Sequence, residues 1–385
     1  MDIPPQAAAQ AAQSDKERLN WLRLIRSERV GPVTFRQLLA RFGSATAALE
    51  ALPDLARRGG GRRSIKLYPR AEAERELDAL AAMGARTLAL NEPDYPAALA
   101  ALDDAPPLLG VLGQPHLLEK PCVAMVGARN ASANGRRLAR QIAAELGQAG
   151  WLVASGLARG IDAAAHEGAL ESGTLAVVAG GLDVIYPEEN TALYGSIKAH
   201  GLIVSEMPPG TVPQARHFPR RNRLISGLSL GTVVVEAAPR SGSLITARLA
   251  GEQGREVMAV PGSPLDPRAR GCNHLIREGA TLVESAADIL EALKALGGTR
   301  TVERKASEFQ EDTPASLDET VVSSARREVH ELLGPTPVAV DELLRQCQVS
   351  PALVHVVLLE LELAGRLERY PGNRVAMIAG DPSGS

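Results

Sequence analysis

A short segment near the middle of the chain, His217–Arg223, combines a histidine, a phenylalanine and three arginines. The ring of Phe218 offers a face on which a nucleobase can stack, and such stacking contributes on the order of 1–3 kcal/mol per base, whichever base it is. Arginine side chains form charge-assisted hydrogen bonds with phosphates. We place this segment in a loop just before a short helix, and it predicts a contact with single-stranded nucleic acid. The candidate contact residues are His217, Phe218, Arg220, Arg221, Asn222 and Arg223.

The same residues allow a second interpretation. An arginine-rich helix can pair with acidic groups of its own protein while the single aromatic residue, Phe218, lies in the core. Composition does not decide between the two, because the formal net charge of the chain is −3 and any nucleic-acid site must therefore be local.

Three further turns each follow a short apolar run and precede a helical pattern. They are Gly127–Ser132, Ser155–Asp162 and Ala238–Thr246. In a parallel α/β sheet, strand ends and helix starts lie along one rim, and the free N–H groups of helix N-termini attract anions. We therefore expect this rim to hold a nucleic-acid backbone. The candidate residues are Gly127, Arg129, Ser155, Gly156, Arg159, Gly160, Ser241, Gly242 and Ser243.

The first of these turns lacks the pattern of a dinucleotide site. That pattern needs Gly-x-Gly-x-x-Gly, and Arg129 stands where the second glycine belongs, so its side chain would block a pyrophosphate. No acidic residue closes the second strand, where Ser155 and Gly156 stand instead. The sequence also lacks a Gly-x-x-x-x-Gly-Lys-Ser/Thr loop. We expect neither NAD nor P-loop chemistry, and no cofactor.

Candidate catalytic and metal-binding groups are sparse. Asp162 and His166 are four residues apart on a predicted helix, and we interpret them as a surface pair. Local sequence contains no Ser/His/Asp set and no cluster of metal ligands.

The cysteines, Cys122, Cys272 and Cys347, are far apart and odd in number, which argues against a disulfide framework or a zinc site. A reducing cytoplasm suits them, and no run of about 18 apolar residues predicts a membrane span.

Short apolar runs alternate with helical patterns through most of the chain. Runs without polar alternation indicate strands that are covered on both faces. The alternation predicts an α/β fold with an extended Rossmann-like, doubly wound and mostly parallel sheet. The expected strands are Thr87–Leu90, Leu108–Leu112, Cys122–Val126, Trp151–Ser155, Leu175–Ala179, Leu202–Ser205, Thr232–Glu236, Glu256–Val260 and Thr281–Val283.

We expect two smaller domains, one before the sheet in the sequence and one after it. A helix, a Gly-Pro turn and a second helix ending at Gly43 predict a small SAM-like or helix-hairpin-helix-like domain, followed by a basic flexible loop, Arg57–Arg63. Three helical patterns and a hairpin predict a C-terminal winged helix. The expected boundaries are 1–14 disordered, 15–84 helical, 85–296 Rossmann-like, 297–321 linker, 322–378 winged helix and 379–385 disordered.

Four motifs together resemble the DNA-processing protein A family, also called DprA or Smf. They are Val126–Arg129, Ser155–Asp162, His217–Ser226 and Ser241–Thr246, and the resemblance covers nearly the whole chain. It implies a bacterial cytosolic protein that binds single-stranded DNA without sequence preference. It also implies that the protein loads the RecA recombinase during natural transformation and homologous recombination, forms a homodimer through the Rossmann-like domain, and is not an enzyme. DNA would contact Arg129, the Ser155–Gly160 turn and the Phe218–Arg223 segment.

Two other functions fit parts of the sequence. The run Leu230–Glu236 is similar to the Gly-Thr turn and catalytic glutamate of nucleotide phosphoribohydrolases, although the preceding Pro-Gly-Gly is missing and Glu236 lies one residue further along. A transcription regulator would read duplex DNA with the predicted helix Pro351–Ala364, but this helix contains no lysine or arginine. Phosphate neutralisation dominates duplex affinity. We therefore expect partner binding or an auxiliary DNA contact there, the latter through the wing residues Arg366, Arg369 and Arg374.

Overall fold

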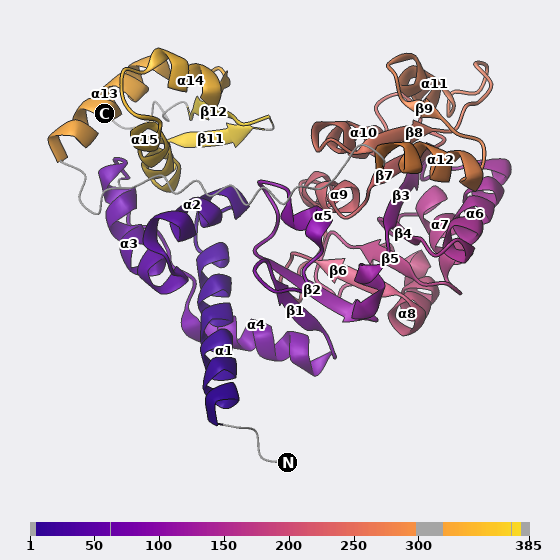
Figure 1. Cartoon of the computed structure of the whole chain (residues 1–385), viewed down its shortest axis with the longest axis horizontal. Helices are drawn as coiled ribbons and strands as arrows, with labels where there is room; N and C mark the ends of the chain where they lie inside the picture. The colour runs from indigo at the N-terminus through magenta and orange to yellow at the C-terminus, as the bar shows by residue number, and fades with distance from the viewer. Residues whose placement is uncertain (1–4, 62, 298–318, 371, 379–385) are drawn as a thin grey trace. The chain divides into compact units, whose positions relative to one another are not determined.

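The computed structural model describes residues 5–61, 63–297, 319–370 and 372–378. It divides into two units, one made of residues 75–303 and the other of residues 1–74 with 304–385 (Figure 1). Most of the expected linker at 297–321, the expected tail at 379–385 and residues 1–4 lie outside the described residues.

Residues 75–303 contain a nine-stranded sheet in the order β1-β2-β6-β5-β4-β3-β7-β8-β9. The seven strands from β6 to β9 in this order are parallel, whereas β1 and β2 run antiparallel at one edge. This confirms the predicted doubly wound, mostly parallel sheet. The strands are β1 Arg86–Ala89, β2 Leu108–Gly113, β3 Cys122–Gly127, β4 Leu152–Ser155, β5 Thr174–Val177, β6 Leu202–Ser205, β7 Gly231–Val235, β8 Glu256–Ala259 and β9 Thr281–Leu282.

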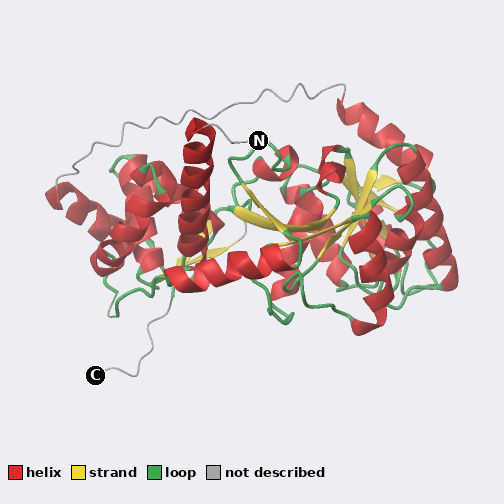
Figure 2. Cartoon of the chain, turned by 90° about the horizontal axis from the view of Figure 1, so that it is seen from below, coloured by secondary structure: helices red, strands yellow, loops and turns green. Residues whose placement is uncertain are grey.

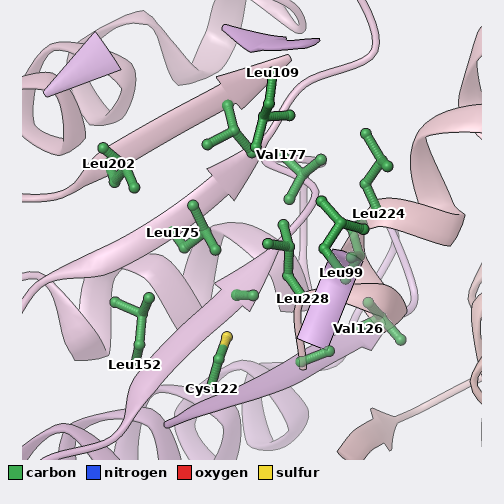
Figure 3. Close-up of a cluster of buried hydrophobic side chains, with 14 of the residues drawn as sticks. Leu99, Leu109, Cys122, Val126, Leu152, Leu175, Val177, Leu202, Leu224 and Leu228 are labelled. Carbon is green, nitrogen blue, oxygen red and sulfur yellow. The ribbon is translucent and has the colours of Figure 1, made fainter. Parts of the chain in front are cut away.

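The central strands are apolar because both of their faces are covered. Along β3, Ala124 and Val126 belong to one buried cluster, and Val123 and Met125 belong to another on the opposite face. Figure 3 shows the first cluster, and Figure 2 shows helices beside the strands. The helices of this unit are α5 Ala97–Ala100, α6 Ala133–Gln148, α7 Ile161–Ala169, α8 Thr191–His200, α9 His217–Gly227, α10 Gly242–Glu252, α11 Arg270–Arg277 and α12 Ala286–Gly297.

The strand order reverses direction at β3. The chain moves from β3 through β4 and β5 to β6 on one side, and then continues on the other side of β3 with β7, β8 and β9. The two strands at the reversal are in register, with Gly127 opposite Val235 at their carboxyl ends. Ligands of open α/β sheets bind in the crevice outside the carboxyl ends at such a point. The fold thus brings the predicted turns to one place.

The other unit combines the N-terminal helices with the winged helix. Helix α1 begins at Pro5, within the segment 1–14 for which we expected disorder. The basic stretch expected as a loop also differs, because Arg57 and Arg58 end helix α3. The elements are α1 Pro5–Arg26, α2 Pro32–Phe42, α3 Ala45–Arg58 and the start of α4 Arg70–Ala82, then α13 Glu319–Leu332, β10 Val338–Ala339, α14 Val340–Gln346, α15 Pro351–Leu363, β11 Leu367–Tyr370 and β12 Arg374–Met377.

From the sequence, the apolar stretch Leu282–Leu296 at the end of this unit is a candidate dimer surface, but much of its described part lies in the core of the unit. Ile289 and Leu293 on α12 are buried in the cluster that also contains residues of α6 and α7. Among the residues of the stretch whose burial is described, 282–294, Leu282 is the one exposed large hydrophobic residue. Among the described residues, no helix is both long and apolar enough to cross a membrane.

Asp162 and His166 are both buried, which corrects their interpretation as a surface pair. Thr174 Oγ1 donates its hydrogen to the Val153 carbonyl at 2.8 Å. The His166 Nδ1 atom, 2.8 Å from the same hydroxyl, must therefore donate to it. The opposite ring atom, Nε2, is buried without a hydrogen-bond partner among the described residues. Burial, assisted by the charge of Arg221, lowers the pKa of His166 to about 3.

We predict that His166 makes the protein sensitive to acid. Its pKa in the folded state lies below its ordinary value of 6.5, so its contribution to stability is complete above pH 6.5 and is lost as the pH falls towards about 3. Over that range the free energy of unfolding should fall by up to about 1.4 kcal/mol per pH unit because of this one group. Chemical denaturation at stepped pH would measure it.

Replacing His166 with glutamine should flatten this dependence, because glutamine does not titrate. The matched control is His274→Gln, since His274 is exposed, with 59% of its side chain accessible. Equal slopes for the two variants between pH 6.5 and 3 would contradict the assignment.

Candidate nucleic-acid interface

Two adjoining hollows lie at the carboxyl ends of the parallel strands. One has a volume of about 680 Å³ and the other about 660 Å³. Both are lined by Arg129, Ala158, Phe218 and Arg221. Because they share these walls, we treat them as one surface and call it the rim groove.

The arginine-rich motif is a helix, not the loop before a helix that we expected. Helix α9 begins at His217 and ends at Gly227. Phe218, Arg221, Asn222 and Ile225 line the rim groove, which is the i, i+3, i+4, i+7 spacing of one helix face. The motif therefore presents only some of its predicted contact residues to the groove.

Phe218 lies among cationic and aromatic groups. The Cζ atom of Arg129 lies 5.4 Å from the centre of the Phe218 ring, and that of Arg221 lies 5.9 Å from it. The ring of Tyr186 is 5.8 Å away, tilted by 54°. Tyr186 is 48% exposed, so an aromatic face remains open beside the cations. The sequence analysis missed Tyr186, although it is one of only five tyrosines and follows the end of β5.

Arg221 is buried and serves the fold directly. Its Nη1 atom donates to the carbonyl oxygens of Gly156 and Val177, and its Nε atom donates to Asn222 Oδ1 at 3.2 Å. Burial lowers the pKa of the guanidinium to about 10, against the opposing charge of Asp162, so it stays cationic at neutral pH. A Cβ atom at Gly156 would lie 2.3 Å from Nη1, and the glycine therefore makes room for this cation.

The second predicted turn satisfies most of its own polar groups. The Asp162 carboxylate accepts hydrogen bonds from the N–H groups of Gly156 at 3.1 Å and Ala158 at 3.4 Å. Burial raises the pKa of Asp162, and Arg221 and these N–H groups oppose the rise. The Ser155 hydroxyl donates to the Met125 carbonyl at 2.6 Å. These groups of the turn are thus occupied within the protein.

Two glycines of the turns permit close approach of backbones. Gly160 has a left-handed φ of 81°, and a Cβ atom there would lie 2.2 Å from the Ala128 carbonyl oxygen. A Cβ atom at Gly127 would lie 1.9 Å from the Val235 oxygen.

Arg159 is the exposed, charged residue among those predicted in the second turn. Its Nη1 atom pairs with Glu189 Oε1 at 3.5 Å.

The N-terminus of α6 is occupied by a carboxylate of the chain itself. Glu236, at the end of β7, accepts hydrogen bonds from the backbone N–H of Ser132 at 2.8 Å and from its hydroxyl. The Ser132 hydroxyl in turn accepts from the Gly135 N–H at 2.9 Å. Glu236 holds a left-handed φ of 54°, which costs a non-glycine residue energy. A dinucleotide pyrophosphate would need this helix start.

The third turn adds exposed cations to the groove. Arg240 is exposed, lines the groove and has a left-handed φ of 67°. Ser241 caps α10 by accepting from the Ser243 N–H at 3.4 Å, and Asn222 approaches the Gly242 carbonyl at 3.5 Å. Arg268, which the sequence analysis did not single out, also lines the groove, paired with Asp266 at 2.9 Å.

Three predicted contact residues of α9 do not line the groove, and neither do Ser155 and Gly160 of the second turn. The guanidinium of Arg223 is buried and forms an ion pair with Glu206, and it also donates to the Asp104 carbonyl. Arg220 is exposed, and its Nε atom lies 3.8 Å from the Oε1 atom of Glu206. His217 is buried, and its Nδ1 atom accepts from the Gln214 N–H at 3.3 Å. For Arg223, the interpretation as a partner of the protein's own acidic groups describes the structure.

The remaining free charge in the groove belongs to two side chains. Within the described part of the chain, Arg129 and Arg240 are exposed and form no ion pair with a carboxylate, whereas Arg159 and Arg268 do. No group of three or more His, Cys, Asp or Glu residues that could hold a metal occurs among the described residues. The groove therefore offers two exposed cations beside an aromatic pair.

Three family models match the chain. DNA recombination-mediator protein A matches residues 86–294, the DprA-like N-terminal HHH domain matches residues 15–79, and the DprA winged helix domain matches residues 311–373. The chain is 32% identical to protein Smf of Synechocystis over 404 residues, covering 94% of this chain and 99% of that protein. It is 43% identical to DNA processing protein DprA of Bacillus subtilis over 231 residues, covering 59% and 77%.

Two solved structures are also similar. The X-ray structure of DprA from Streptococcus pneumoniae has a TM-score of 0.59 and 38% identity, covering 70% of this chain and 95% of that one. The Helicobacter pylori DprA structure, described as giving insight into the single-stranded DNA binding mode of that protein, has a TM-score of 0.51 and 31% identity, covering 55% and 96%. The chain therefore belongs to the DNA recombination-mediator protein A family, whose curated relatives are named DprA and Smf.

Proposed function

We propose that this protein binds single-stranded DNA in the rim groove, without sequence preference, and loads RecA onto it during natural transformation and homologous recombination. The observation that carries the DNA-binding part is the pair of aromatic rings that line the groove, the partly exposed Phe218 and the exposed Tyr186, beside the cation of Arg129. The DNA-binding mode described for the Helicobacter pylori relative supports it. RecA loading rests on membership of a recombination-mediator family.

The groove favours single strands for a physical reason. A base inside a duplex already stacks on both neighbours, so its face is unavailable to Phe218 or Tyr186. A base in a single strand can stack there, and the contact tolerates any base because every base has a π-face. Arg129 and Arg240 supply the charges that contact phosphates.

The enzymatic alternative is disfavoured by the position of its key carboxylate. In nucleotide phosphoribohydrolases the corresponding glutamate would face a substrate, whereas Glu236 is held by the N–H and hydroxyl of Ser132. We therefore propose a binding protein without catalytic activity. We also propose that it acts in the cytoplasm, where RecA filaments assemble, and that it forms a homodimer through the unit that contains the sheet.

Neutralising Arg129 and Arg240 should weaken single-strand binding and reduce its salt dependence. Each lost phosphate contact should lower the slope of log K against log salt by about 0.7. Fluorescence anisotropy with labelled oligo-dT at several salt concentrations would measure the slope for Arg129→Gln, Arg240→Gln and the double variant. The matched control is Arg248→Gln, because Arg248 is exposed on α10 and pairs with Glu252. An unchanged slope in the double variant would rule out this path for the backbone.

Removing the Phe218 ring should weaken binding in a way that salt does not change. We expect Phe218→Ala to lose about 1–3 kcal/mol of binding free energy with the salt slope intact, because stacking is not electrostatic. Phe218→Tyr should keep most of the affinity, since it keeps the ring. The same anisotropy titrations test both variants. Equal losses in Phe218→Ala and Phe218→Tyr would show that the ring is not a stacking platform.

Arg223 should affect stability and not DNA affinity. Arg223→Gln removes the close, buried partner of the Glu206 carboxylate and leaves it only the exposed Arg220 at 3.8 Å, and breaking a buried pair costs about 3–5 kcal/mol. The neighbouring Arg220→Gln is the control, since 57% of the Arg220 side chain is accessible and its loss should leave stability almost unchanged. Urea denaturation measures stability, and titration at a temperature where both variants stay folded measures affinity. A stable but weakly binding Arg223→Gln protein would return Arg223 to the DNA site.

A further inference from the structure

Helix α15 occupies the position of the DNA-reading helix in a winged helix, yet it is buried on two faces. One row of side chains, Val354, Val357, Leu358 and Leu361, belongs to the core of the winged helix. A second row is also buried but forms no part of that core; it consists of Val356, Leu359, Glu360 and Leu363. A DNA-reading helix needs its outer face free to enter the major groove.

The N-terminal helical domain covers this helix. Helix α3 packs on α15 within the same unit. The turn that follows α3 approaches the end of α15 so closely that a Cβ atom at Gly59 would lie 2.0 Å from the Glu360 carbonyl oxygen and 2.9 Å from the Ala364 Cβ atom. Gly59 has a φ of −71°, so the glycine is required by this approach and not by its own backbone conformation.

Polar contacts join the same two domains. Arg29 Nη1 donates to the Leu363 carbonyl at 3.0 Å, where cations are favourable because the C-terminus of a helix carries partial negative charge. Arg29 holds a left-handed φ of 61° there. On the wing, Arg369 pairs with Glu362 at 2.8 Å and its Nη2 atom donates to Gln37 at 3.3 Å. An arginine expected to favour DNA is thus engaged within the protein.

The charged residues of α15 also differ from those expected in a DNA-reading helix. Its residues include no lysine or arginine. Its buried carboxylate, Glu360, pairs with Arg326 of α13 at 2.8 Å. A helix that enters a DNA groove approaches phosphates, and their neutralisation supplies most of the affinity.

We propose that α15 is a protein-docking helix whose partner is the N-terminal domain of the same chain, and that the winged helix therefore does not read duplex DNA through it. The apolar second row, the close approach of Gly59 and the hydrogen bond from Arg29 carry this proposal. It is independent of the rim groove and of single-strand binding.

Hydrogen–deuterium exchange of the full-length protein, followed by mass spectrometry, would test it. Gly59→Ala places a methyl group against the backbone of α15 and should raise exchange in both α3 and α15 by about tenfold or more, because amides protected by tertiary packing exchange faster when it is lost. The matched control is Gly31→Ala in the same domain, where an added Cβ atom has no neighbour within 4 Å. Exchange in the strands of the sheet should not change in either variant.

Three results would overturn the proposal. The first is unchanged exchange of α15 in Gly59→Ala. The second is protection of α15 in the wild type on adding a duplex oligonucleotide, which would restore it as a DNA-reading helix. The third is protection that rises with protein concentration, which would assign the docking surface to a second copy of the chain. Protection of α15 that is independent of concentration and duplex, and is lost in Gly59→Ala alone, supports the proposal.

Discussion

The Arg221 guanidinium donates to the carbonyl oxygens of Gly156 and Val177, which lie where β4 and β5 end. A buried charge is costly unless hydrogen bonds and an opposite charge compensate it, and here the carbonyls and Asp162 do so. The same helix carries Phe218 one turn earlier. The hydrogen bonds that hold Arg221 therefore also fix the aromatic face of the rim groove against the strand ends, and Gly156 must be a glycine to leave room for them.

This arrangement makes the rim of the Rossmann-like sheet unsuited to a dinucleotide, which is consistent with the proposal that it binds a polymer. Glu236 fills the start of α6, and Asp162 binds the N–H groups of the second turn. The backbone donors that usually attract a pyrophosphate are thus occupied. In the proposed function, the side chains of Arg129 and Arg240, which are exposed along the groove, attract the phosphates instead. Flexible side chains spaced along a surface suit an extended backbone better than a compact cradle of N–H groups does.

Sequence patterns predicted the sheet well and the groove in part. Strands such as β3 and β6 were placed to within a residue at each end, because burial on both faces leaves uninterrupted apolar runs. The position of the groove followed from strand–helix turns. The roles of individual arginines did not, because the partner of Arg223 is Glu206, on a different element, and no local pattern reveals such a pair. Tyr186 was missed for the same reason, since its ring meets Phe218 only in the folded chain.

In the winged helix, the sequence composition of α15 is accounted for by the contacts that this helix makes. An apolar, acidic α15 argued against duplex reading from the sequence alone, but gave no account of why its outer row is apolar. The packing of α3 and the approach of Gly59 supply that account. If the N-terminal domain keeps α15 covered in solution, the proposed selectivity for single strands need not be shared between two sites. It would then come from the rim groove alone, where stacking on Phe218 requires an unpaired base.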